Sequence, residues 1–270
     1  MNADLIYDVG MHKGEDTEFY LRKGFRVVAI EANPELAAAC ATRFKEPVEK
    51  GRLTIVNKAI NDAPGAIDFY INENESVWST ANLHWAKRNE KRGTTNTVIK
   101  VDAVTIASVI EAHGEPYFMK VDIEGNDIFC LTGLRSLGEK PKFISVESSA
   151  TSEKDTMEQL DVLAELGYTR FKIVSQHDVA RQTCPNPPRE GLFVDHSFTW
   201  GASGLFGEET PGPWKSLDQV RSEYRRIHFD CRMAGQNAGI FRKVNRWKMR
   251  RLLGRMFPRS KGWFDTHATY

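Results

Sequence analysis

The chain has 270 residues, of which 41% are hydrophobic and 27% charged, with a formal net charge of +1. This is the composition of an ordinary globular protein, long enough for one large α/β domain or two small ones. The near-neutral charge argues against a general nucleic-acid binder. No apolar run approaches the roughly 20 residues of a membrane span. The four cysteines are widely spaced and suggest neither a zinc site nor a disulfide framework.

The first residues, Met-Asn-Ala-Asp, lead directly into an apolar run, without the three parts of a secretory signal. We therefore expect a cytoplasmic protein in a reducing compartment. From there to about residue 176, β-rich runs alternate with segments of helical periodicity, which predicts an α/β fold with a mostly parallel sheet covered by helices.

The boundaries of these elements can be read from the sequence. The predicted strands are Leu5–Val9, Arg26–Glu31, Leu53–Asn57, Tyr117–Asp122, Phe143–Glu147 and Thr169–Val174. The predicted helices are Glu15–Lys23, Pro34–Phe44, Val104–His113, Asp127–Leu137 and Ser152–Leu166. Gly24 and Gly167 are typical of helix ends, and Asn33 followed by Pro34 is typical of a helix start.

Three segments depart from this alternation. A strand over Ala66–Ile71 could pair with the third strand or lie at the sheet edge, and the polar stretch 72–97 is typical of a loop or short helical insertion over the site. Residues 177–241 are rich in glycine and proline, so we expect a loop-rich, substrate-facing continuation of the 1–176 core. We expect residues 242–270 to form a basic amphipathic helix and tail.

The basic helix, Arg242–Lys261, has nine cationic and no acidic residues, and one apolar face. It could pack on the domain, lie on an anionic membrane surface as a peripheral contact, or bind an anionic substrate or nucleic acid. The aromatic residues and glycines expected of an RNA-binding surface are not interleaved with its charges, so we expect no nucleic-acid partner.

The turn after the first strand reads Asp8-x-Gly10-x-x-x-Gly14, in which glycine lets a ligand approach the backbone. Dinucleotide-binding domains have a similar turn but require G-x-G-x-x-G, and His12 replaces the middle glycine. Glu31 ends the second strand about 21 residues after Gly10, where it can accept hydrogen bonds from both ribose hydroxyls of a nucleoside cofactor. Alternatively, Glu31 stabilises the following helix N-terminus, and Asp8 binds loop amides.

Three segments carry a family resemblance. They are Asp8-Val9-Gly10-Met11-His12-Lys13-Gly14, Ala29-Ile30-Glu31-Ala32-Asn33-Pro34 and Met119-Lys120-Val121-Asp122-Ile123-Glu124-Gly125. Together they resemble the FkbM family of S-adenosylmethionine-dependent methyltransferases, over roughly residues 5 to 150. The resemblance implies a Rossmann-like class I methyltransferase fold with a seven-stranded sheet and helices on both faces. It also implies O-methylation of a hydroxyl on a sugar, glycan or other natural product.

Ligands of open α/β sheets lie outside the carboxyl ends of the strands. We expect S-adenosylmethionine to contact Asp8, Gly10, His12, Gly14, Glu31, Ala32, Asn33, Ala59 and Asp122. The candidate catalytic residues are Asp122, Glu124, His12 and Lys120, with Glu147 at the next strand end. A proton could be taken by Asp122, Glu124 or His12.

Asp122 and Glu124 could instead hold a divalent cation together, or one of them could cap the helix after Gly125. No histidine has convincing ligand spacing, so metal dependence is left open, and His84 and His177 are more typical of solvated loop residues. Two other functions stay open beside methyl transfer: a nicotinamide-dependent oxidoreductase and a catalytically silent cofactor-binding module. The sequence predicts a small-molecule or glycan acceptor without identifying it, and leaves the oligomeric state undefined.

Overall fold

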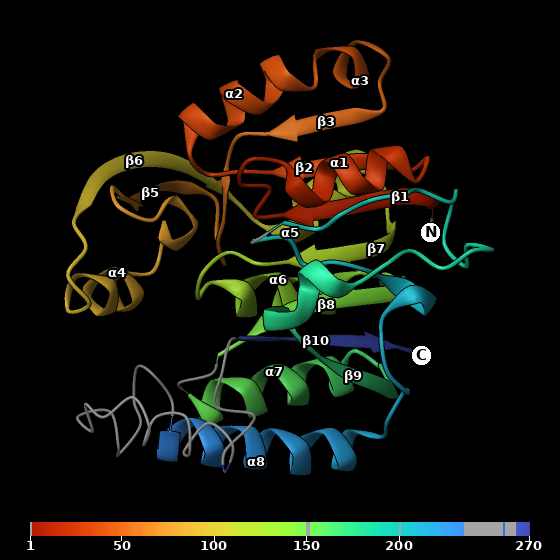
Figure 1. The fold of residues 1–270 in the computed structure, drawn as a ribbon. Helices are drawn as coiled ribbons and strands as arrows, with labels where there is room; N and C mark the ends of the chain where they lie inside the picture. The colour runs from red at the N-terminus through yellow and green to blue at the C-terminus, as the bar shows by residue number, and fades with distance from the viewer. Residues whose placement is uncertain (1, 150–151, 200, 235–255, 257–262) are drawn as a thin grey trace.

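The computed structural model describes residues 2–149, 152–199, 201–234, 256 and 263–270. A seven-stranded sheet with the order β3-β2-β1-β7-β8-β10-β9 forms its centre (Figure 1). Its strands are β1 (Asn2–Val9), β2 (Arg26–Ile30), β3 (Leu53–Val56), β7 (Pro116–Val121), β8 (Phe143–Ser148), β9 (Arg170–Ser175) and β10 (Phe264–Thr269). All neighbouring pairs are parallel except the two that β10 makes, which are antiparallel. The mostly parallel sheet predicted from the alternation is confirmed.

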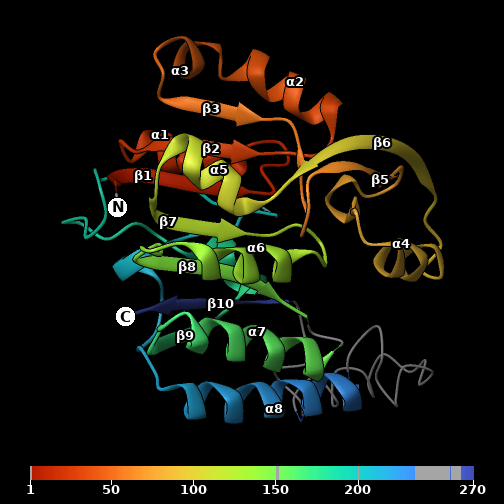
Figure 2. The same ribbon diagram turned by 180° about the vertical axis from the view of Figure 1, so that it is seen from behind.

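Helices lie on both faces of this sheet, as Figures 1 and 2 show from opposite sides. They are α1 (Glu15–Arg22), α2 (Pro34–Arg43), α3 (Lys45–Glu49), α4 (Leu83–Glu90), α5 (Ile106–His113), α6 (Asp127–Gly133), α7 (Glu153–Glu165) and α8 (Leu217–Ala234). Short 3₁₀ turns occur at Ser76–Trp78, Leu134–Ser136, Gln176–Arg181 and Gly207–Glu209. The predicted helix starts are confirmed at Asn33, whose Oδ1 accepts from the Glu35 amide at 2.9 Å, and at Ser152, whose Oγ accepts from the Asp155 amide at 3.2 Å.

Successive strand residues point to opposite faces and bury two hydrophobic cores. In β1, Tyr7 and Val9 face the core under α5 to α8, while Ile6 faces the core under α1. The second core is completed by the loop segment after β9 rather than by a further helix, because Phe198 and Phe206 pack there against the aromatic residues of α1. Each such buried side chain contributes about 1.5–3 kcal/mol.

This packing corrects the expectation for residues 177–241. The segment to about residue 216 is loop-rich as expected, but much of it covers the sheet face, and α8 was not predicted. The tail after residue 242 also contains an unpredicted element, since β10 lies between β8 and β9. The predicted basic helix, Arg242–Lys261, lies outside the described residues apart from Met256. Within the described part of the chain, no helix is long and apolar enough to span a bilayer.

A second, three-stranded sheet has the order β4-β6-β5 and comprises β4 (Ala59–Ile60), β5 (Gly65–Asn72) and β6 (Asn96–Val104). The strand expected at 66–71 exists as β5, but it pairs antiparallel with β6 instead of joining the large sheet. The segment 72–97 contains a 3₁₀ turn and α4, in agreement with the expected helical insertion. Figure 1 shows this sheet and α4 beyond the carboxyl ends of the parallel strands, where a ligand site is expected.

Candidate active site

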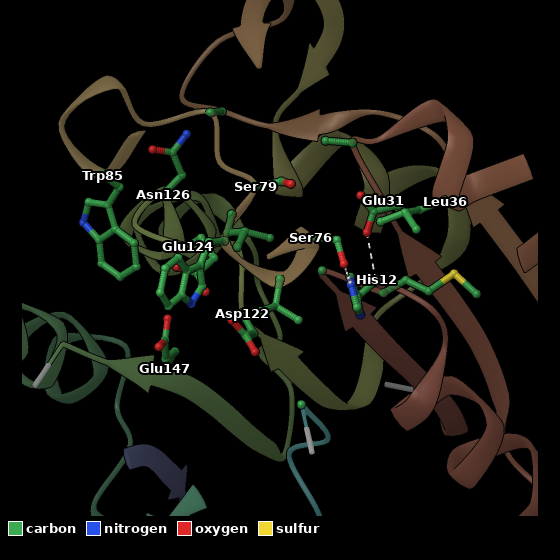
Figure 3. Close-up of a pocket in the computed structure, with 18 of the residues that line it drawn as sticks. His12, Glu31, Leu36, Ser76, Ser79, Trp85, Asp122, Glu124, Asn126 and Glu147 are labelled. Carbon is green, nitrogen blue, oxygen red and sulfur yellow. Dashed lines mark hydrogen bonds between the residues drawn. The ribbon is translucent and has the colours of Figure 1, made fainter. Parts of the chain in front are cut away.

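A cavity of about 650 Å³ lies between the carboxyl ends of the parallel strands and the insertion. Its walls come from the turn after β1, the ends of β2, β7 and β8, and the segment 75–92 (Figure 3). This volume is in the range of small-molecule and cofactor sites. The cavity therefore lies where strand order alone predicts a ligand.

The turn after β1 is fixed against two neighbouring strands. The amides of Gly10 and Met11 both donate to the carbonyl of Ile30 at 3.0 Å. Gly10 has a φ of +90°, and a Cβ placed on it would lie 1.8 Å from the carbonyl oxygen of Asp122. Only glycine fits at this position, because β7 passes directly beside it.

Glu31 lies at one end of the cavity, and two backbone amides hold its carboxylate. Oε1 accepts from the amide of Asn33 at 2.7 Å, and Oε2 accepts from the amide of His12 at 2.8 Å. Burial raises the pKa of Glu31, while these amide hydrogen bonds oppose the increase. Each carboxylate oxygen has further acceptor capacity, so the side chain can also bind the two hydroxyls of a ribose.

His12 lies at the same end of the cavity and links the turn to the insertion. Its Nε2 and the Oγ of Ser76 are 2.9 Å apart, and its Nδ1 is 3.5 Å from Glu15. Figure 3 shows His12 beside Ser76 and Glu31, across the cavity from Glu147. The structure therefore groups His12 with the expected cofactor residues rather than with the other candidate bases.

Lys120 forms a buried charged group under the turn. Its Nζ donates to the carbonyl of Gly10 at 2.8 Å and lies 3.2 Å from Asp8 and 3.7 Å from Asp16. Burial alone would lower the pKa of Lys120, but the carboxylates of Asp8, Asp122 and Asp16 outweigh it and raise that pKa. Lys120 therefore holds the turn against β7 through its ammonium group, and a catalytic role for Lys120 stays a prediction.

Asp16 was not expected from the sequence, where it reads as an ordinary acidic residue in the first turn of a helix. It lines the cavity, is only 3% exposed, and accepts the amide of Ser203 on both carboxylate oxygens at 3.0 Å. Burial raises the pKa of Asp16 to about 7, against the opposing effect of Lys120. Asp8, in contrast, is fully buried behind the wall and accepts a hydrogen bond from Thr17 at 2.6 Å.

Three carboxylates meet at the other end of the cavity. Oxygen atoms of Asp122, Glu124 and Glu147 lie within 4.8 Å of one another, a spacing that is also compatible with a divalent cation. Burial, and then the neighbouring carboxylates, raise the pKa of both Glu124 and Glu147. Like charges this close disfavour full ionisation, so the group holds a proton more strongly than isolated carboxylates do.

The backbone around Glu124 is held in an unusual conformation, with φ of +54° at Glu124 and +101° at Gly125. The carboxylate of Asp127 accepts the amides of Ile123 and Gly125, each at 3.0 Å, and the hydroxyl of Thr80 donates to the carbonyl of Glu124 at 2.7 Å. Neither Asp122 nor Glu124 caps α6, which has no side-chain cap among the described residues; Asp127 instead holds the turn before the helix, and both candidate residues line the cavity.

The insertion supplies aromatic and cationic side chains that sequence reasoning missed. The guanidinium of Arg88 stacks on the ring of Trp85 at 3.8 Å, and that of Arg92 lies 5.8 Å from the ring centre of Trp78. All four side chains line the cavity. Their positions depend on how α4 docks, so no local motif reveals them.

The residues expected from the sequence fall into two groups, those that line the cavity and those that do not. The cavity walls include Gly10, His12, Glu31, Ala32, Ala59, Lys120, Asp122, Glu124 and Glu147, and also His177, which was expected to be a solvated loop residue. Three expected contacts lie behind the walls instead: Asp8, Gly14 and Asn33. A Cβ on Gly14 would meet the ring of Phe44 at 2.5 Å, and the side chain of Asn33 caps α2, so both have packing or capping roles. His84 is exposed and does not line the cavity.

Comparison with known proteins gives a family. The model of the methyltransferase FkbM domain matches residues 8–173, more than half of the chain. No curated protein matches the chain significantly.

Solved structures show only distant similarity. A precorrin-6y C5,15-methyltransferase from Geobacter metallireducens is 11% identical over 73% of this chain and 77% of its own, with a TM-score of 0.37. An S-adenosylmethionine-dependent methyltransferase from Thiobacillus denitrificans, in complex with S-adenosyl-L-homocysteine, is 10% identical over 99% and 85%, with a TM-score of 0.36. An S-adenosylmethionine-dependent O-methyltransferase from Thermotoga maritima is 18% identical over 64% and 48%, with a TM-score of 0.32.

Proposed function

The chain belongs to the methyltransferase FkbM family, and from this premise we propose that it transfers the methyl group of S-adenosylmethionine to a hydroxyl of a sugar, glycan or other natural product. S-adenosylmethionine supplies a methyl group activated by its sulfonium. Family membership argues against the nicotinamide-dependent alternative, and the His12 that replaces a required glycine agrees with this.

The observation that carries the cofactor proposal is the environment of Glu31. The carboxylate is held in one orientation by the amides of His12 and Asn33 and lines the cavity beside the glycine turn. A carboxylate fixed in this way can bind the ribose hydroxyls without first losing its own side-chain freedom. The protein thereby binds and orients the nucleoside end of the donor.

In this proposal the acceptor hydroxyl lies at the end of the cavity that contains the carboxylates of Asp122, Glu124 and Glu147. An alcohol must lose a proton during methyl transfer, and a base is most effective when its pKa is near the working pH. Burial and the neighbouring carboxylates raise the pKa of Glu124 and Glu147, which makes both stronger bases than ordinary carboxylates. We assign proton removal to this pair, with Asp122 between it and the cofactor end (Figure 3).

Calorimetric titration with S-adenosylmethionine, S-adenosylhomocysteine and NAD tests the cofactor. We expect the first two to bind and NAD not to bind. Glu31→Gln should weaken binding by about tenfold or more, because a hydrogen bond to a charged group is worth about 1.5–3 kcal/mol. Glu35→Gln, which changes an exposed carboxylate four residues away, should have no effect.

Turnover is measured as S-adenosylhomocysteine released with a panel of hydroxylated acceptors. Release with at least one sugar or natural-product alcohol supports the function. Binding of NAD instead of S-adenosylmethionine would refute it. Tight binding of S-adenosylmethionine without release on any acceptor would indicate the silent binding module.

A further inference from the structure

The insertion brings two arginines to the carboxylate end of the cavity, one helical turn apart. Arg88 is in α4, and Arg92 follows its end. Both line the cavity, and the side chain of Arg88 is 23% exposed. Their guanidinium groups stand on the tryptophan rings of Trp85 and Trp78, which limits their motion.

Neither arginine has a close carboxylate. Arg88 donates from Nε and Nη2 to the Oδ1 of Asn89 at 3.3 and 3.2 Å, while its nearest carboxylate oxygen, on Glu124, is 3.8 Å away. Within the described residues, the guanidinium of Arg92 has no hydrogen bond or ion pair; it contacts the Trp78 ring and feels the charges of Arg88 and Glu124 at longer range. Burial lowers the pKa of both arginines, which reflects the cost of taking their charge out of water. Among the residues that the structure describes, Arg88 keeps N–H donors that its two bonds to Asn89 do not use, and Arg92 keeps all five, so an anion between the two guanidinium groups would find free donors on both.

This end of the cavity therefore presents two kinds of side chain, carboxyl groups and guanidinium groups. The carboxyl groups of Glu124 and Glu147 line the cavity and can accept hydrogen bonds from a hydroxyl. The guanidinium groups present planar donors suited to two oxygens of one anion. A ligand that binds both the carboxyl groups and the guanidinium groups has a hydroxyl and an oxyanion on the same molecule.

We propose that the acceptor carries an oxyanion, a phosphate or a carboxylate, which Arg88 and Arg92 bind while the hydroxyl lies at Glu124 and Glu147. The inference rests on the proposed methyl transfer, because it concerns the acceptor of that reaction. The anion holds the acceptor in one orientation and selects charged over neutral alcohols.

Matched probes test this inference by calorimetry on the full chain saturated with S-adenosylhomocysteine. The pairs are glucose 6-phosphate with glucose, glucuronate with glucose, and 4-hydroxybenzoate with 4-hydroxybenzamide. We expect at least one anionic probe to bind about tenfold or more tightly than its neutral counterpart, with the phosphate and carboxylate arms identifying the anion. Arg92→Gln should abolish this difference, and Arg92→Lys should keep part of it.

Lys91→Gln is the matched control, because it removes the same charge from the adjacent, exposed residue that does not line the cavity. It should leave the preference unchanged, and melting temperatures check that each variant is folded. Equal binding within every pair, or no binding of any probe, would overturn the inference. So would a preference that survives in Arg92→Gln.

The cofactor also has a carboxylate, so its binding is measured first on each variant. Weaker binding of S-adenosylhomocysteine to Arg92→Gln would assign the anion to the cofactor and overturn the inference. If S-adenosylhomocysteine does not bind the wild type, the proposed function fails, and the probe titrations, repeated without it, judge the anion site separately.

Discussion

Replacing Lys120 with methionine should destabilise the protein strongly and in a pH-dependent manner. The side chain of Lys120 is 5% exposed, and its Nζ interacts with Asp8, Asp16 and the carbonyl of Gly10. Methionine retains much of the packing volume but none of the charge. The substitution therefore leaves two buried carboxylates without their shared cation.

The expected loss is about 3–5 kcal/mol in the free energy of unfolding at pH 8, as is typical when one partner of a buried ion pair is removed. The loss should be smaller at pH 5.5. Without the ammonium, the folded-state pKa of Asp16 rises further from about 7, whereas its unfolded value stays near 4. Stability then falls as the pH rises through this window, because only the unfolded state releases its protons there.

Guanidinium denaturation at pH 5.5 and pH 8 measures both quantities. Lys100→Met is the matched control: that lysine pairs with Asp68 at 2.8 Å but its side chain is 69% exposed, so its loss should cost about 0–1 kcal/mol. A Lys120→Met deficit no greater than the control, or one that does not change with pH, would refute the reasoning about the buried charges.

Two further predictions concern the acceptor end. Because a base must be ionised, the kcat/KM of the wild type should rise with pH to a plateau. In Glu124→Gln, kcat/KM should fall by about 100-fold or more, and its rise with pH should disappear. EDTA should leave the turnover of the wild type unchanged. A pH profile that Glu124→Gln preserves, or turnover that EDTA abolishes, would contradict this assignment. Gly125→Ala should cost about 1–3 kcal/mol in thermal or chemical denaturation, since its Cβ would meet the ring of Trp85 at 2.8 Å with φ at +101°. Gly138→Ala, with nothing within 4 Å, should cost less than about 0.5 kcal/mol, and equal costs at the two glycines would contradict the steric argument.

Much of the sheet could be predicted because its parallel strands are short apolar runs separated by helices with readable caps. Other elements were missed although their signal was present. In α8, Val220, Tyr224, Ile227 and Cys231 are buried at spacings of four, three and four residues. In β6, Val101 and Ala103 alternate with exposed neighbours, but the residues between the insertion and the helix expected from Val104 were assigned to no element.

Elements defined by distant partners could not be predicted in this way. The strand β10 reads Phe-Asp-Thr-His-Ala-Thr, and its polar residues are buried only because strands pack on both of its edges. The candidate site likewise contains residues that the local sequence predicts and residues that distant contacts position. Gly10, Glu31 and the carboxylates follow from strand order, whereas Arg88 and Arg92 depend on long-range hydrogen bonds such as that from Asn82 to the carbonyl of Gly125.

The position of β10 also bears on how the protein is synthesised. During translation β9 emerges long before residues 264–269, yet the ladder that joins it to the rest of the large sheet runs through β10. The edge of β8 is equally uncovered until then, and exposed strand edges are prone to pair with other chains. The large sheet can therefore be completed only after residues 264–269 have been synthesised, and until then these edges of β8 and β9 have no β10 partner.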